Sequence, residues 1–255
     1  MKLRAAAFVT TTIVGIGLAA GGCTTSPTAS PAPGRSGPVV SPTASAPSAK
    51  AELVAAVRRT QRAPHRYAVR GDLPDKQRVR ATGAFDAKAR RISYTLQESG
   101  GKNPQALQRI VIAKDEYTRE SKRDRWVHLN LRRVKKGGIH DFDMTDPTGL
   151  THFAATIRSV DRIDPHTYRG TYDPFEGSGE FLPIGVPSII TFGQGGADDF
   201  TVRTDAKGWV TSIETVLTTK KATMRMKTTL SAHGKRSAIT RPRSFGEAMD
   251  FYYDR

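Results

Sequence analysis

Two neighbouring stretches of sequence, Arg78-Val-Arg-Ala-Thr-Gly-Ala-Phe85 and Arg91-Ile-Ser-Tyr-Thr-Leu-Gln97, decide the fold. In each of them, apolar side chains alternate with polar or small ones. Side chains on a β-strand point alternately to opposite faces, so this period of two predicts strands with one buried and one solvated face. Such strands are typical of an antiparallel sheet.

The same alternation recurs further along the chain, with turn residues between the segments. Asp205-Ala-Lys-Gly208 has the composition of a hairpin turn. The Gly- and Pro-rich segment 174–198 is apolar, but we expect no single long helix there. The further predicted strands are 107–113, 116–120, 126–131, 167–172, 200–204, 209–217 and 223–232.

Two segments have helical periodicity instead. The first, 51–61, follows Ser48, which is a good N-cap, and precedes Pro64. The second is expected to be capped by Asp146, with Pro147 at its first position. The apolar stripes that identify them are Leu53, Ala56, Val57 and Thr60 in the first helix, and Leu150, Phe153, Ala154 and Ile157 in the second.

The start of the chain has the form of an export signal. Lys2 and Arg4 precede an uncharged stretch, 5–20, which is too short at about 1.5 Å per residue to span a hydrocarbon core of about 30 Å comfortably. Small residues then lead to Cys23, the one cysteine of the chain. The ending Ala-Gly-Gly-Cys resembles a bacterial lipobox, with Ala20 where Leu is usual.

This signal predicts the domain organisation. We expect a signal peptide over 1–22, a flexible tether over 23–49 and one β-rich domain over 50–255. The tether is rich in Pro, Ser, Thr and Ala and cannot bury enough apolar surface to offset its ordering entropy. Cys23 is expected to carry palmitate-type acyl chains that anchor a lipoprotein to the extracytoplasmic face of the cell membrane. The alternative is a plain secreted protein with an incidental cysteine.

The chain is basic, with a formal net charge of +16. Outside the cell we expect no nucleic-acid partner, and anionic lipids or anionic wall polymers are the expected neighbours. The alternative is that the basic residues form the solvated face of the sheet. The candidates for contact with an anionic surface are Arg132, Arg133, Lys135 and Lys136.

Catalytic and metal-binding motifs are absent from the sequence. There is no Gly-x-Ser-x-Gly, His-Glu-x-x-His or Gly-rich phosphate loop, and the six His residues are scattered. Asp141, Asp143 and Asp146 lack the Gly and the distal Glu of a calcium loop, so a loop leading into a helix cap explains them better. We therefore expect a protein that is not an enzyme and needs no cofactor or metal.

The order of these parts resembles the actinobacterial LppX/LprG-type lipoproteins, whose domain is related to the carrier LolA. The resemblance covers most of 50–243, and its motifs are fold landmarks without catalytic residues. It implies an α+β fold: a strongly curved antiparallel sheet, or half-open barrel, with helices on its concave face and, in some members, lipid tails between them. The motifs are Arg80-Ala-Thr-Gly-Ala-Phe85, Glu116-Tyr-Thr-Arg119, Arg125-Trp-Val127, Thr167-Tyr-Arg-Gly-Thr171 and Phe200-Thr-Val-Arg-Thr-Asp-Ala-Lys-Gly208.

A lipid or glycolipid ligand would lie between the sheet and the helices, because two short helices and a loop have trouble filling a bent sheet. We therefore expect a monomeric, envelope-anchored lipoprotein that binds or carries a lipid or amphiphile. The alternative is an interaction or sensor module with a filled core. The candidate cavity residues are Leu53, Val57, Phe85, Ile92, Tyr94, Leu96, Leu150, Phe153, Ile157, Met224, Met226 and Leu230.

Overall fold

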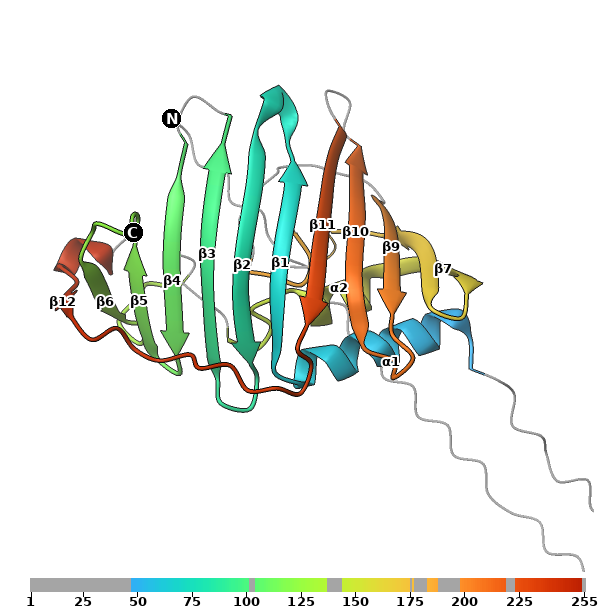
Figure 1. Cartoon of the computed structure of the whole chain (residues 1–255), viewed down its shortest axis with the longest axis horizontal. Coiled ribbons are helices and arrows are strands. Elements are labelled where there is room, and N and C mark those ends of the chain that lie inside the picture. Colours follow the sequence, from blue (N-terminus) through green and yellow to red (C-terminus); the bar gives the residue numbers. More distant parts are fainter. Residues whose placement is uncertain are drawn as a thin grey trace, which may run out of the picture. The chain divides into compact units, whose positions relative to one another are not determined.

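The alternating segments form one large, curved and unclosed sheet, which Figure 1 shows in a computed structural model. The structure describes residues 47–100, 104–136, 144–174, 176, 183–187, 198–218 and 223–253. Cys23, most of the predicted tether, Asp141 and Asp143 therefore lie outside the described residues. The strands are β1 (His65–Asp72), β2 (Arg78–Asp86), β3 (Arg91–Ser99), β4 (Ala106–Ile112), β5 (Asp115–Arg119), β6 (Trp126–Asn130), β7 (Ile157–Asp164), β8 (Thr167–Tyr172), β9 (Asp198–Thr204), β10 (Val210–Thr218), β11 (Thr223–Ser231) and β12 (Phe245–Glu247).

In the described part of the chain the strand order is β12-β6-β5-β4-β3-β2-β1-β11-β10-β9-β8-β7. Neighbours are antiparallel, except that β12 runs parallel to β6. The pairing of β1 with β11 joins the early meander to the late one. β7 and β12 are the two edges, so the sheet does not close into a barrel.

Two α-helices accompany the sheet: α1 (Ala49–Arg62) and α2 (Leu150–Thr156). The expected cap of α1 is confirmed, because the side chain of Ser48 accepts a hydrogen bond from the backbone N–H of Ala51. α1 packs on α2, β7 and β10. Short 3₁₀ turns occur at η1 (Pro74–Lys76) and η2 (Asp250–Tyr252). No helix in the described ranges is both long enough and apolar enough to cross a membrane.

The predicted start and end of the second helix are wrong. Its N-cap is Gly149, whose left-handed φ of 66° turns the chain after Asp146, so Pro147 precedes the helix. The Asp146 carboxylate still accepts a hydrogen bond from the His152 backbone N–H, at 2.8 Å. Ile157, predicted to lie on the helix, is the first residue of β7.

Three strands, β1, β7 and β12, are absent from the sequence-based prediction. Most of β7 is exposed, as befits an edge strand, and it lacks the alternation of buried and exposed residues that betrays a half-buried strand. β12 has only three residues, too few to show a period. The predicted alternation is confirmed elsewhere, most regularly in β11, where every second residue is buried.

Two glycines in the landmark motifs allow close packing on the buried face. A Cβ on Gly83 would lie 2.5 Å from the Tyr67 hydroxyl oxygen. The Tyr67 side chain therefore crosses Gly83, and its hydroxyl donates to the Ser93 carbonyl oxygen at 3.1 Å. A Cβ on Gly170 would similarly lie 2.9 Å from the ring of Phe200. These positions need glycine for space rather than for backbone conformation.

Candidate functional site

The twelve side chains predicted to line a cavity all belong to one buried cluster. They come from α1, α2, β2, β3, β7 and β11, and none is more than 7% exposed. The structure therefore brings together residues that are up to 177 positions apart, from Leu53 to Leu230. We call this cluster, with the sheet face that carries it, the core face.

Beneath α2 the core face is filled by aromatic rings. The ring of Phe153 lies 5.4 Å from that of Tyr172 and 5.1 Å from that of Phe200, both edge to face. This is the geometry that aromatic pairs prefer. The sequence analysis did not select Tyr172 or Phe200, although both occupy inward positions of predicted strands. Their packing closes this part of the core.

Further along the sheet, the core face carries a charged pair. The Arg109 Nε atom lies 2.8 Å from a carboxylate oxygen of Glu116, and the two side chains are 13% and 0% exposed. The guanidinium carbon of Arg109 also lies 5.9 Å from the ring centre of Tyr94. Burial opposes the charge of Arg109, but the neighbouring Tyr94 and Glu116 outweigh it and raise its pKa. Burial likewise raises the pKa of the Tyr94 hydroxyl.

The sequence analysis missed this pair, although a signal existed. Arg109 is opposite Tyr94, and Glu116 is opposite Val111, in the registers of β3–β4 and β4–β5. Both charged residues therefore occupy positions that face the buried side of the sheet. The residues opposite them, Tyr94 and Val111, are buried and apolar or aromatic. A charge at an inward position of an alternating strand indicates a buried partner or a function.

An acidic side chain lies at the start of β9, beside the aromatic rings. Asp198 is 4% exposed. Burial raises its pKa to about 7, and the nearby carboxylates of Asp173 and Asp199 add to the effect. Burial also raises the pKa of Tyr172, with the charge of Asp198 contributing. Within the described residues, no group of three or more His, Cys, Asp or Glu side chains is arranged to hold a metal ion.

Two of the hollows of the described surface open away from the core face. One, of about 260 Å³, lies over β1, β2 and β3 on the opposite face of the sheet. The other, of about 520 Å³, lies beside α1 and is lined in part by Arg58, Arg62 and Trp209. Arg59 stacks on Trp209, with its guanidinium carbon 4.2 Å from the ring centre. Neither hollow is formed by the predicted cavity residues.

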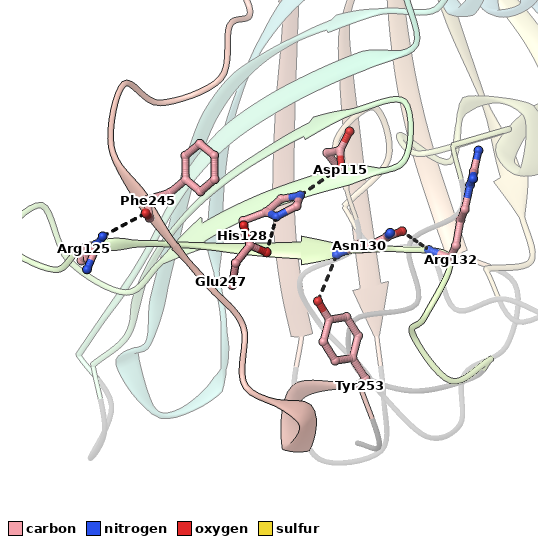
Figure 2. Close-up of polar contacts among 8 residues, drawn as sticks. All are labelled: Asp115, Arg125, His128, Asn130, Arg132, Phe245, Glu247 and Tyr253. Atoms are coloured by element: carbon pink, nitrogen blue, oxygen red, sulfur yellow. Dashed lines mark hydrogen bonds and ion pairs between the residues drawn. The ribbon is translucent and has the colours of Figure 1, made fainter.

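The basic residues predicted to contact an anionic surface lie in the exposed segment after β6. Arg133 pairs with Asp250 at 2.9 Å and lies 4.0 Å from the ring centre of Tyr253. The backbone N–H of Lys135 donates to the Tyr253 carbonyl oxygen at 3.1 Å. Figure 2 shows the second contact, in which the Tyr253 hydroxyl accepts from the Asn130 backbone N–H at 3.3 Å. This segment therefore holds the C-terminal residues 245–253, which we call the strap.

The strap is also held by a histidine, which Figure 2 shows between two carboxylates. His128 bonds Asp115 through Nε2 at 2.9 Å and Glu247 through Nδ1 at 2.8 Å. Burial opposes its charge, but the two hydrogen bonds outweigh burial and raise the pKa of His128. Its ring stacks on Tyr117 at 5.0 Å. The scattered spacing of the six histidines in the sequence gave no sign of this contact.

Comparison with known proteins gives only distant structural likeness. No family model matches the chain, and no curated protein matches it. An uncharacterised conserved protein from Thermus thermophilus is 11% identical, with a TM-score of 0.41, covering 78% of this chain and 97% of its own. A LolA superfamily protein from Nitrosomonas europaea is 10% identical, with a TM-score of 0.26, covering 77% of this chain and 99% of its own. At these scores we base the function on the chain's own residues.

Proposed function

We propose that this protein is an envelope-anchored, non-enzymatic lipoprotein of LppX/LprG type that binds or carries a lipid or amphiphile on the core face. The observation that carries the proposal is the extent of that face. α1 packs on β7 and β10, near one end of the sheet, whereas the predicted lining reaches β2 and β3. The lining there is buried, so in this proposal an apolar tail enters beyond the first helix by displacing the part of the chain that covers β2 and β3.

The charged pair supports an amphiphile rather than a wholly apolar ligand. Arg109 and Glu116 lie on the same face as Ile92 and Leu96, so a tail along these strands would bring its polar end to them. A buried pair with Tyr94 beside it offers both hydrogen-bond donors and acceptors. In this proposal the pair orients the ligand and the apolar lining holds its tail.

The alternative, a filled interaction or sensor module, is favoured by one observation. The rings of Phe153, Tyr172 and Phe200 interlock as they do in an ordinary core. If such packing continues beneath β2 and β3, no tail can enter. The two functions thus differ in how far the aromatic packing extends.

Native mass spectrometry of the full-length protein, made in an actinobacterial host, tests the proposal. A co-purified lipid, released on unfolding and absent from a mock preparation, is the expected result. A ligand-free protein with a stable protein partner would overturn it in favour of the filled module. Turnover of a panel of esters would instead indicate a hydrolase.

The anchor is tested separately. We expect Cys23→Ser to leave the protein uncleaved or to release it, because the acyl acceptor is lost. Stable anchoring takes two or more acyl chains. If the variant still fractionates with membranes at wild-type levels after a high-salt wash, the lipobox interpretation is wrong. The lipid-binding proposal would survive that result.

A further inference from the structure

The face of the sheet opposite the core face carries an unusual arrangement of charge, which is independent of the proposed lipid site. Arg70 on β1 lies directly opposite Arg80 on β2. On its other side Arg70 is opposite Lys227 of β11. Three cations thus occupy adjacent positions on three neighbouring strands. Like charges directly opposite one another destabilise a sheet.

The nearby carboxylates are already engaged. Lys227 pairs with Glu214 at 2.6 Å, and Asp72 lies 4.0 Å from Arg78. Between Arg70 or Arg80 and any described carboxylate, no ion pair within 4.0 Å occurs. Both arginines are exposed. No described carboxylate therefore offsets the repulsion between them, which only solvent and dissolved ions screen.

The same two arginines border a hollow of about 260 Å³. It forms where Ala68 of β1, a small residue, lies opposite Thr82 of β2, which in turn lies opposite Thr95 of β3. Two hydroxyls and the amide of Gln97 also line the hollow, so it offers hydrogen-bond donors as well as two cations. We call the hollow the arginine pocket; its lining includes Ala68, Arg70, Arg80, Thr82, Thr95 and Gln97.

We propose that the arginine pocket binds a phosphate group, as free phosphate, as a phosphate ester or as the phosphate of a lipid headgroup. Guanidinium groups form paired hydrogen bonds with phosphate oxygens, and a tetrahedral anion can receive such pairs from two sides. Bound phosphate removes the repulsion between Arg70 and Arg80, while the threonine hydroxyls donate to its remaining oxygens. A carboxylate has only two oxygens and satisfies one arginine.

Thermal unfolding of the full-length protein tests this site, with inorganic phosphate replacing chloride at constant ionic strength. We expect phosphate to raise the wild-type Tm by roughly 2 to 4 °C. In chloride, Arg70→Gln/Arg80→Gln should melt at or above the wild-type Tm, because the repulsion is gone, and phosphate should no longer raise it. The matched control is Arg66→Gln/Arg169→Gln, which removes two cations from the same face outside the pocket; it should keep the full phosphate effect.

The source of the phosphate is distinguished by co-sedimentation of the released, unacylated Cys23→Ser protein, which cannot bind through acyl chains, with vesicles of phosphatidylglycerol and phosphatidylcholine. If the pocket variant loses both the phosphate effect and vesicle binding, relative to the control, the ligand is a lipid headgroup. If it loses the phosphate effect alone, the ligand is a soluble phosphate. Equal loss in the control variant, or no phosphate effect in the wild type, overturns the proposal.

Discussion

The two ends of the core face differ in chemistry. Beneath α2, at β8 and β9, Phe153, Tyr172 and Phe200 fill the space with interlocking rings. At β4 and β5 the same face holds Arg109 and Glu116, which are desolvated and paired. Packed aromatic rings need no charged partner, although the buried carboxyl of Asp198 adjoins them, whereas a buried ion pair offsets its desolvation only with good geometry and full hydrogen bonding. In the proposed function the charged end serves to orient the ligand.

Removing one partner of the pair should have the largest effect. Glu116→Ala leaves the Arg109 charge buried without its carboxylate, and we expect a loss of about 3 to 5 kcal/mol in the free energy of unfolding, measured by urea denaturation. The double variant Arg109→Met/Glu116→Leu is the control. It should recover most of the stability but lose any co-purified amphiphile. A loss below about 1 kcal/mol in Glu116→Ala would show that the pair is solvated, and the contrast would disappear.

At the aromatic end, Asp198 provides a test with a pH signature. Its pKa is raised to about 7 in the folded state, above the unfolded value of about 3.9, so the folded protein binds this proton more tightly. Stability from this group is complete below about pH 4 and is lost as pH rises through 7. We expect Asp198→Asn to raise stability at pH 8 by roughly 2 to 4 kcal/mol and to change little at pH 4.

The control for this test is Asp199→Asn, an exposed neighbour on the same strand. Because burial is the main cause of the raised pKa of Asp198 and the Asp199 carboxylate only adds to it, this variant should reduce the pH dependence of unfolding far less than Asp198→Asn does. If Asp198→Asn has the same effect at pH 4 and pH 8, Asp198 does not titrate differently in the folded and unfolded states. The aromatic end would then hold no buried acid.

The sequence predicted most of the sheet, because burial on one face imposes a period of two. The boundaries of β2, β3 and β8 agree with the predicted segments to within two residues. The core residues followed for the same reason: Met224, Met226 and Leu230 alternate with exposed neighbours. These features are local, so a short window of sequence contains them.

The remainder depended on contacts between distant segments. Glu247 is 119 residues from His128, and no local pattern connects them. The second helix starts at Gly149, whose backbone is left-handed. The Asp146-Pro147 sequence places this start about three residues too early. The same holds for the basic residues predicted to contact an anionic surface, because Arg133 among them pairs with Asp250 of the strap, 117 residues away.

Met226 lies between the two ends and tests how far the filled packing extends. It is opposite Gly71, and its own side chain borders the place of the missing one, since a Cβ on Gly71 would lie 3.4 Å from the Met226 Cγ atom. In a close-packed core, Met226→Trp costs about 1 to 3 kcal/mol of unfolding free energy. In the proposed lipid site we expect it to cost less than about 1 kcal/mol. We also expect it to block the uptake of a fluorescent fatty acid, which fluorescence titration measures. A loss of about 1 to 3 kcal/mol in unfolding free energy, together with a wild-type protein that does not bind the probe, favours the filled module.

The smallest effect is expected at the strap, beyond the charged end. The pKa of His128 is raised above 6.5 by Asp115 and Glu247, which face it from β5 and β12. Its contribution to stability is therefore complete below about pH 6.5 and is lost as pH rises through the higher folded value. Glu247→Gln should lower the free energy of unfolding by less than about 1 kcal/mol at pH 5.5, because the carboxylate is largely exposed, and the difference should vanish by about pH 9. His166→Gln, at an exposed histidine far from the strap, is the control and should show no such trend. A Glu247→Gln deficit that stays constant over this pH range would mean that the His128 contacts do not hold the strap, which would then depend on β12 pairing and on the contacts of Asp250 and Tyr253.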